Sequence, residues 1–459
     1  MGANLARNIE RNGYICAVYN RTAEVTRRFS EEYNGNFLPS YSLEDFVSSL
    51  VRPRKILLMV KAGVAVDAVI DALLPYLEEG DLIADLGNSH FKDTKRRGEY
   101  LSGKGIRFLG VGISGGEEGA LWGPSIMAGG DRSGWEEVRD IFDKISAKAP
   151  DPCHAYIGPE GSGHFVKMVH NGIEYGDMQL IAESYHLLKE GFDFSNELLG
   201  NTFAKWNEGV LSSYLIEITS RIFKVKDREG DGYLLDKILD KAHQKGTGKW
   251  TVETALELGV AVPVIASAVT ARGLSMIKDE RVKAAQKLKE SGSVEYGGLD
   301  RDSAGDCVES ALYCSKIMSY AQGLSLIKKA SDKWKWGVDI GEVASIWRGG
   351  CIIRASFLDD ITLAYKEDSS LDNLVLAPFV KEALLSRLNE WRKAIAFGVS
   401  CGIPLLGMSS ALAYYDSYRR ANLPQNLTQA QRDFFGAHTY ERVDKEGVFH
   451  TEWEEENQS

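Results

Sequence analysis

The stretch GSGHFVKMVHNGIEYGDMQLIAE, residues 161–183, decides how the rest of the chain is interpreted. Apart from isolated glycines it contains nothing that forbids a helix. At about 100° per residue, one sector of roughly 140° collects five polar side chains, namely Lys167, His170, Asn171, Glu174 and Tyr175. Apolar residues such as Val166, Val169 and Ile173 gather on another sector. The stretch therefore predicts a helix with a base, an acid and hydrogen-bonding groups along a single stripe.

A stripe of this kind has two interpretations. On an arbitrary helix, polar residues most often form a solvated face. Such a face is normally filled with long flexible charges, whereas this stripe interleaves His, Asn and Tyr and is followed by the mostly apolar run MQLIAESYHLL. We therefore expect it to line an enclosed site, where burial lowers the pKa of a lysine and raises that of a glutamate.

The composition bounds the class of protein. A chain of 459 residues, 44% hydrophobic and 26% charged, is long enough for two or three domains with a large core. The net charge of -11 gives no general attraction to nucleic acid or anionic membranes, so an anionic substrate needs a local cluster of cations. No apolar run reaches the length of about 18 residues that a membrane span needs.

Six cysteines are scattered along the chain without close metal-type spacing or a secretory signal. We expect free thiols in a reducing compartment, a cytoplasmic protein and no metal site.

The first residues resemble the second half of a βαβ unit. Residues 1–13 predict a helix that stops at Gly13, and residues 14–19, YICAVY, predict a strand. In a dinucleotide-binding unit the first strand and its glycine turn precede that helix. Gly2 would then be the last glycine of the G-x-G-x-x-G motif, and the first strand would lie before Met1.

The residues after the predicted strand, Asn20, Arg21 and Thr22, indicate which cofactor is bound. An acidic residue at this point binds the ribose hydroxyls of NAD, whereas an arginine favours the 2′-phosphate of NADP. The sequence here has Arg21 and no acid, and it therefore predicts NADP.

Further strand-like runs occupy residues 55–60, 82–86 and 107–111, separated by amphipathic helices such as residues 65–77. This alternation predicts a parallel sheet covered by helices, whose ligands bind beyond the carboxyl ends of the strands. The residues expected along that edge are Val60, Lys61, Ala62, Gly63, Gly87, Asn88, Ser114, Gly115 and Gly116. The last three belong to the glycine-rich stretch 113–130, which we expect to be a loop whose amides approach a carboxylate closely.

From about residue 161 the chain becomes helical, which places a domain boundary near Pro159. This region contains an internal repeat. Trp206 with SYLIEIT at 213–219 recurs as Trp347 with SFLDDIT at 356–362. The long period suggests a duplicated helical bundle. The second copy has Ser319 in place of Glu174, so only the first copy is expected to be catalytic.

Two basic elements interrupt the helical region, the loop QKGTGKWT with Lys245 and, further along, Arg272. The last 40 residues, from about 422, lose helical periodicity and hold Arg432 and His438 among several aromatic residues. A tail docked onto another subunit would bury those aromatics, which predicts a homodimer.

Assembled in order, these motifs closely resemble the decarboxylating 6-phosphogluconate dehydrogenase family, the NADP-linked enzymes of the pentose phosphate pathway. The resemblance runs from residue 1 to residue 453. The motifs that carry it are NRT, MVKAG, SGGEEGA with GPSIMAGG, KMVHNGIEYGDMQ, KGTGKWT and QRDFFGAHTYERVDKEG. It implies an N-terminally incomplete Rossmann-type cofactor domain at 1–160, an all-helical substrate and dimerisation domain at 161–421, and a tail at 422–459 that reaches the partner subunit.

The resemblance also implies a role for each matching residue. Lys167 would be the general base and Glu174 the general acid. The substrate 6-phosphogluconate would be held by Asn88, Ser114, Gly115, Gly116, His170, Asn171, Tyr175, Lys245 and Arg272, with Arg432 and His438 from the partner's tail. NADP would be bound by Gly2, Asn20, Arg21, Thr22, Val60, Lys61, Ala62 and Asn88, with no metal.

The resemblance implies oxidative decarboxylation of 6-phosphogluconate, and two other functions stay open. A chain without the family's first strand loses several kcal/mol of burial and pairing. It would then be an impaired isoform that dimerises and binds substrate without turnover. A sibling β-hydroxyacid dehydrogenase acting on a small unphosphorylated acid is disfavoured by the helical duplication and by Lys245, Arg272 and Arg432.

Overall fold

The computed structural model describes residues 1–288 and 299–453. The chain divides into two compact units, Met1–Ala411 and Leu412–Ser459, each of which is described by itself. The first unit contains both an α/β part and a helical part, which are joined because helix α8 packs against strands β5, β6 and β7.

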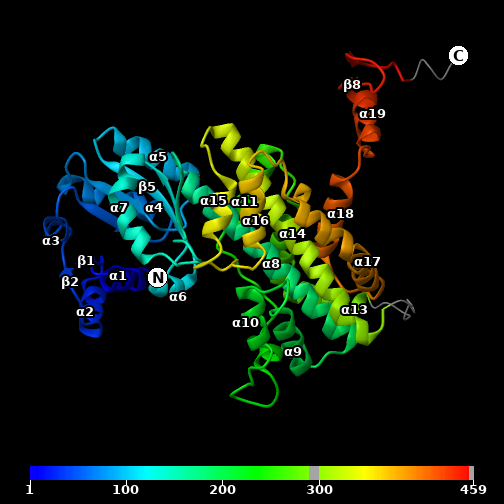
Figure 1. Cartoon of the computed structure of the whole chain (residues 1–459), viewed down its shortest axis with the longest axis horizontal. Coiled ribbons are helices and arrows are strands. Elements are labelled where there is room, and N and C mark those ends of the chain that lie inside the picture. Colours follow the sequence, from blue (N-terminus) through cyan, green and yellow to red (C-terminus); the bar gives the residue numbers. More distant parts are fainter. Residues whose placement is uncertain (289–298, 454–459) are drawn as a thin grey trace. The chain divides into compact units, whose positions relative to one another are not determined.

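The α/β part alternates helices and strands as the sequence predicts. Its elements, in chain order, are α1 Gly2–Arg11, β1 Cys16–Tyr19, α2 Ala23–Glu32, β2 Phe37–Ser40, α3 Leu43–Ser48, β3 Lys55–Leu58, α4 Val64–Leu73, the 3-10 turn η1 Leu74–Tyr76, β4 Leu82–Asp85, α5 Phe91–Ser102, β5 Arg107–Ile113, α6 Gly116–Trp122, β6 Ile126–Gly130, α7 Arg132–Ile145 and β7 His154–Gly158. Figure 1 shows these elements in blue to cyan, with helices beside the sheet.

The strands form a five-stranded sheet in the order β3-β4-β5-β6-β7, and β1 and β2 form a separate parallel pair. Among the described residues, neither β1 nor β2 pairs with a strand of the larger sheet. Strands β3, β4 and β5 are parallel, but β6 runs antiparallel to β5. The parallel pairing predicted for the runs at 55–60, 82–86 and 107–111 is confirmed, and β6, which the sequence pattern does not predict as a strand, adds an antiparallel neighbour. The connection through the short helix α6 turns the chain back instead of crossing over the sheet.

Part of the glycine-rich stretch 113–130 is this strand β6, and not the loop that we expected. Glycine suits the strand because helix α8 begins directly against it. A Cβ atom on Gly129 would lie 2.4 Å from the backbone nitrogen of Gly163. The glycines thus allow the start of α8 to touch the sheet.

Two apolar clusters cover the faces of the sheet. On one face, Leu5 of α1 and Val138 of α7 pack with Leu82 and Leu109. On the other, residues of α3, α4 and α5 pack with strand residues such as Ile83 and Phe108. Strand β4 is buried along its whole length because it is covered on both faces.

The helical part begins with α8 Ser162–Phe192, which confirms the helix predicted from residues 161–183. It continues with α9 Asn196–Trp206, α10 Tyr214–Ile222, η2 Leu234–Lys237, α11 Thr247–Leu258, α12 Pro263–Met276, α13 Lys278–Lys287, α14 Arg301–Trp334, α15 Ile340–Ile346, α16 Leu358–Glu367, η3 Leu374–Leu376, α17 Pro378–Ser400 and α18 Leu406–Tyr418.

The helices show the predicted duplication. Each copy consists of one long helix, α8 or α14, followed by two short helices, α9 and α10 or α15 and α16. The long helices pack against each other, and the two copies of the repeat meet at an antiparallel bridge between Ser213 and Ala355. Both copies therefore contribute to one helical core (Figure 1, green to yellow).

The second unit holds the end of α18, helix α19 Gln425–Gly436 and a small hairpin of β8 Tyr440–Glu441 and β9 Val448–Phe449. The prediction that the tail lacks a helix is wrong. The end of α19 is held by the buried carboxylate of Asp433, which accepts hydrogen bonds from the backbone N–H groups of Thr439 and Thr451 and from Trp453 Nε1. Asp433 is 6, 18 and 20 residues away from these three partners in the sequence. The local periodicity of the sequence therefore does not reveal the contacts.

The described residues also bear on the state of the cysteines and on a possible membrane span. All six cysteines are unpaired thiols, which confirms that prediction. In the described part of the chain, no helix has the length and apolar character needed to cross a membrane.

Candidate active site

Lys167 lies on α8 where this helix passes the end of β5. A Cβ atom on Gly112 would lie 2.3 Å from Lys167 Cβ, so the lysine stem rests against the strand backbone. The side chain is buried, with 6% of its surface exposed. Burial lowers its pKa to about 8, although the nearby Glu174 and Cys351 act in the opposite direction. An amine with this pKa is partly neutral near physiological pH and can accept a proton.

His170 links Lys167 to the loop after β5. Its Nδ1 atom lies 3.4 Å from Lys167 Nζ and 3.1 Å from Asn171 Oδ1, and its Nε2 atom lies 3.2 Å from Ser114 Oγ. Burial and the adjacent Lys167 hold the pKa of His170 well below its usual value, so the ring is neutral. A neutral ring hydrogen-bonds without adding a second positive charge beside the lysine.

The turn after Ser114 requires glycine. Gly115 and Gly116 both have positive φ values, 99° and 66°. A Cβ atom on Gly115 would also lie 2.6 Å from the carbonyl oxygen of Gly350. The loop therefore passes so close to Gly350 that a side chain at position 115 would not fit.

Glu174 and Tyr175 continue the stripe away from the sheet. Burial raises the pKa of Glu174, while Lys167 and Arg272 oppose that rise. The guanidinium of Arg272, from α12, lies 3.4 Å from the centre of the Tyr175 ring. Arg272 NH1 also donates to the carbonyl of His243, 3.3 Å away, in the loop that carries the exposed Lys245. Arg272 and the loop that carries Lys245 thus lie at this end of the stripe.

The predicted cofactor residues follow the ends of two strands. Asn20, Arg21 and Thr22 connect β1 to the N-terminus of α2. There the Asn20 side chain accepts a hydrogen bond of 2.9 Å from the backbone N–H of Thr22, and Arg21 is exposed. An exposed arginine at a helix N-terminus suits a phosphate group, and the carboxylate in the first turn of α2, Glu24, pairs with Arg27. These residues fit NADP.

The other cofactor residues lie at the carboxyl ends of β3 and β4. Val60, Lys61 and Ala62 follow β3, and Asn88 follows β4 with its side chain exposed. Gly2 begins α1, where an added Cβ atom would lie 3.3 Å from the Met59 side chain, next to Val60. The structure therefore brings the N-terminus of α1 close to the loop after β3.

Arg432 and His438 lie in the second unit, where both are exposed. Arg432 NH1 donates to Gln429 Oε1 at 3.1 Å. The expected contribution of these two residues to a site in a partner subunit stays a prediction.

Sequence reasoning missed residues around Lys167 and His170 that come from the second helical copy. The Trp347 ring packs against His170 with centroids 5.5 Å apart, and the buried thiol of Cys351 donates to the Trp347 carbonyl. In the sequence, only the repeat at 206–219 and 347–362 marks Trp347. Its place beside the first copy depends on how the two copies pack, which the sequence pattern does not contain.

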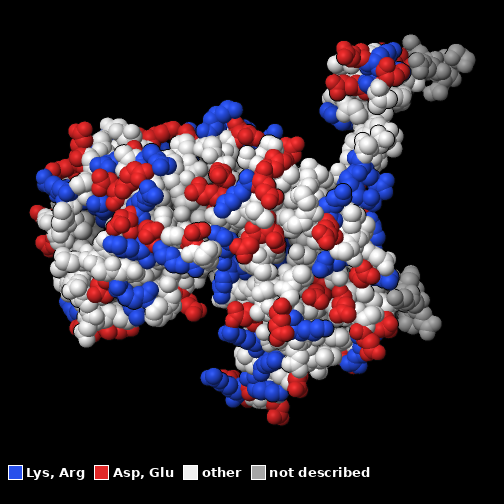
Figure 2. All heavy atoms as spheres, viewed as in Figure 1, with Lys and Arg blue, Asp and Glu red and all other residues white. Residues whose placement is uncertain are grey.

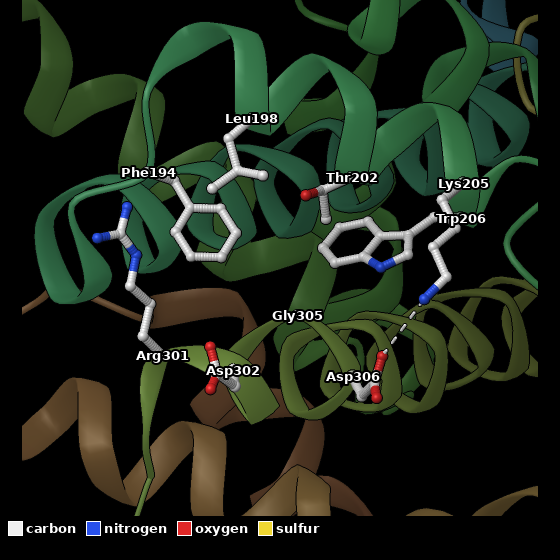
Figure 3. Close-up of a pocket in the computed structure, with 9 residues that line it drawn as sticks. All are labelled: Phe194, Leu198, Thr202, Lys205, Trp206, Arg301, Asp302, Gly305 and Asp306. Carbon is white, nitrogen blue, oxygen red and sulfur yellow. Dashed lines mark ion pairs between the residues drawn. The ribbon is translucent and has the colours of Figure 1, made fainter.

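The surface carries side chains of both signs of charge (Figure 2). On the face seen in Figure 2, acidic and basic side chains are interspersed. The pocket in Figure 3, between α9 and the start of α14, contains none of the predicted site residues.

Within the described residues, no group of three or more His, Cys, Asp or Glu side chains is arranged to hold a metal ion.

A Rossmann-type α/β part followed by a helix that presents a buried lysine is typical of the class of nicotinamide-dependent dehydrogenases. Two family models cover most of the chain. The NAD binding domain of 6-phosphogluconate dehydrogenase matches residues 1–158, and the 6-phosphogluconate dehydrogenase C-terminal domain matches residues 163–453. The chain belongs to the 6-phosphogluconate dehydrogenase family.

Individual relatives agree with this assignment. A decarboxylating 6-phosphogluconate dehydrogenase from Synechococcus elongatus is 56% identical, with 99% of this chain and 97% of the relative covered. The NADP(+)-dependent enzyme of Bacillus subtilis is 54% identical with the same coverage. A solved 6-phosphogluconate dehydrogenase from Plasmodium falciparum, studied with NADP+ and with 6-phosphogluconate, is 44% identical. Its TM-score is 0.96 over 99% of this chain and 98% of that one.

Proposed function

We propose that this protein catalyses the oxidative decarboxylation of 6-phospho-D-gluconate to D-ribulose 5-phosphate and CO2, with reduction of NADP to NADPH. The observation that carries the proposal is the buried Lys167, with its lowered pKa, on the same helical stripe as Glu174. The proposal divides the chain into a cofactor domain at 1–160, a helical domain at 161–421 and a tail at 422–459.

Bound NADP supplies a hydride acceptor. Lys167 is proposed to remove the proton from the substrate hydroxyl as the hydride leaves, since it is the buried amine of the stripe. The resulting β-keto acid loses CO2 readily when its ketone oxygen is polarised, and the now protonated Lys167 can donate a hydrogen bond to that oxygen.

The enediol that remains after loss of CO2 needs a proton on carbon. Glu174 lies two helical turns from Lys167 on the same face, and its raised pKa keeps a larger share of the carboxyl protonated near neutral pH. We propose that Glu174 donates this proton. Ser114, His170 and Asn171 would orient the sugar acid between the two groups, with Gly115, Gly116 and Asn88 beside them.

The phosphate of the substrate suits the end of the stripe where Arg272 lies over the Tyr175 ring. Stacking on the ring restricts the guanidinium, so less conformational entropy is lost when it binds an anion. Lys245 is on the loop whose His243 carbonyl Arg272 contacts. We propose that both cations bind this phosphate.

We also propose that the protein is a homodimer in which Arg432 and His438 of each tail complete the site of the other subunit. Phe434 and Phe435 support this proposal, because 56% and 72% of their surfaces are exposed in the single chain. Aromatic side chains on a tail are stabilised by burial against a partner.

The experiment that tests the function measures NADPH by absorbance and CO2 by trapping, with 6-phosphogluconate and NADP as substrates. The expected result is one CO2 for each NADPH. Activity with gluconate in place of 6-phosphogluconate should be far lower, because the cations then lack their phosphate. NADPH without CO2, or equal rates with the two sugar acids, would contradict the proposal.

A further inference from the structure

Arg97 is a buried arginine that no predicted role includes. It lies on α5, in the run FKDTKRRGEY. The many charged residues of this run are typical of a helix face exposed to solvent. Only 1% of its side chain is exposed, whereas 56% of its neighbour Arg96 is exposed. A buried guanidinium is stabilised only when fixed partners replace its water.

The partners of Arg97 come from three segments. Its Nε and NH2 atoms donate to the two carboxylate oxygens of Asp67 on α4, at 2.8 and 3.1 Å. NH2 also donates to the carbonyl oxygen of Gly63 at 3.0 Å. NH1 donates to Ser89 Oγ at 3.3 Å and lies 3.6 Å from an oxygen of Asp85. The hydrogen bond from Arg97 is the main cause that lowers the pKa of Asp67 to about 2.

These contacts join the two loops that carry the expected cofactor residues. Gly63 ends the loop of Val60, Lys61 and Ala62 after β3. Ser89 directly follows Asn88 after β4. The guanidinium therefore spans the space between the ends of two neighbouring strands.

The second of these loops is itself held by Asp85. One oxygen of this carboxylate accepts from the backbone N–H of Gly87 at 3.0 Å, and the other accepts from Ser89 Oγ at 2.6 Å. Asp85 thereby closes a turn around Asn88, and Arg97 ties that turn to the Gly63 carbonyl.

We propose that Arg97 is a positioning residue for the cofactor, whose guanidinium sets the spacing between the loop 60–63 and the loop 87–89. This inference rests on the proposed function, because it takes the cofactor to lie across these two loops. Arg97 acts through the backbone and does not touch the ligand itself. Lysine cannot replace it, because a single terminal nitrogen cannot reach Asp67, Gly63 and Ser89 together.

The test compares Arg97→Lys with Arg96→Gln. Arg96 NH2 also donates to Asp67, at 2.8 Å, so the control variant loses an Asp67 contact but leaves both loops tied. The dissociation constant of NADP is measured by titration without substrate, and that of 6-phosphogluconate is measured separately without NADP. Thermal melting checks that each variant is folded.

For Arg97→Lys we expect NADP to bind roughly ten-fold more weakly, because loops displaced by a fraction of an ångström no longer match the ligand. Binding of 6-phosphogluconate should change by less than about two-fold, since most of its proposed contacts lie on α8, α12 and the loop after β5. Arg96→Gln should change neither constant by more than about two-fold, because its contact is exposed.

Three outcomes would overturn the proposal. Arg97→Lys binding NADP as the wild type does would show that the spacing is set elsewhere. Equal weakening of both ligands would indicate a general structural role, and an equal loss in Arg96→Gln would assign the effect to Asp67 alone. A wild-type chain that binds NADP but does not oxidise 6-phosphogluconate would refute the proposed function and leave this comparison intact.

Discussion

The Lys167 amine is buried and has a pKa of about 8. A general base that acts near neutral pH needs a lowered pKa of this kind. For Lys167→Met we expect kcat to fall by about 10³-fold, because general base catalysis contributes on that order. The dissociation constant of 6-phosphogluconate should change only a few-fold, since the other stripe residues remain. Steady-state kinetics and a binding titration measure the two quantities, and a variant with near-normal kcat would remove Lys167 as the base.

The same pKa predicts a pH dependence. Its value in the folded protein lies below the ordinary 10.5 of lysine, so Lys167 loses its proton as the pH rises through about 8. Only the neutral amine can act as a base, so kcat/KM should rise about ten-fold per pH unit below that pH and level off above it. A pH profile with no limb in this range would contradict the assignment of Lys167 as base.

Arg21 is expected to distinguish NADP from NAD, because it is exposed beside the N-terminus of α2. For Arg21→Glu we expect NADP to bind at least about 100-fold more weakly, with NAD changed by less than ten-fold, since only NADP carries the phosphate that the acid repels. Arg27→Glu is a matched control because Arg27 pairs with Glu24 within α2. Equal losses for both cofactors would argue against recognition of the 2′-phosphate by Arg21.

At the scale of elements, Asp433 organises the tail. Its carboxylate accepts from Thr439 and Thr451 N–H, His450 Nδ1 and Trp453 Nε1. Burial by itself would raise its pKa, but hydrogen bonds from these four residues hold the pKa at about 2. Because that value lies below the ordinary 3.9 or so of an unfolded aspartate, the stabilisation is complete above about pH 4 and is lost as the pH falls towards 2.

For Asp433→Asn we therefore expect a loosened tail, because an amide presents a donor where the carboxylate only accepts. Hydrogen exchange in α19 should become faster. The KM for 6-phosphogluconate should rise by about ten-fold with a smaller change in kcat, since Arg432 and His438 lose their support. Asp444→Asn is the control, as Asp444 is exposed and bonds to Arg442. Unchanged exchange in α19 would show that other contacts hold the tail.

At the scale of the whole molecule, tail exchange predicts complementation between two inactive variants. In a mixed dimer of Lys167→Met and Arg432→Ala subunits, one site receives both Lys167 and the partner's Arg432. We expect co-expression to restore about a quarter of wild-type activity, because half of the dimers are mixed and each has one intact site. Lys167→Met with Glu174→Gln is the control, since both changes lie on α8 and no mixed dimer recovers a site.

Recovery in the first pair but not in the control would support a shared site. No recovery in the first pair, with mixed dimers confirmed by affinity tags on each subunit, would place Arg432 in its own subunit's site. Sedimentation velocity of the wild type would separately establish the oligomeric state.

Local patterns by themselves determined much of this protein. The period of polar residues along 161–183 predicted α8 and its stripe, because a helix places residues three and four apart on one face. Alternating apolar runs predicted β1, β3, β4 and β5, and the repeat at 213–219 and 356–362 predicted the duplicated helices. These features depend on neighbours along the chain, which a single sequence contains.

Only the tertiary structure decided the rest. The antiparallel direction of β6, the helix in the tail and the place of Trp347 beside His170 all depend on contacts between distant segments. Arg97 is the clearest case. Lys95, Arg96 and Glu99, close to it in sequence, are exposed charges, and its own burial follows from the folding of α4 and the loop after β4 around α5. Burial and pKa are properties of the packed environment, so the same residue type is solvated at 96 and enclosed at 97.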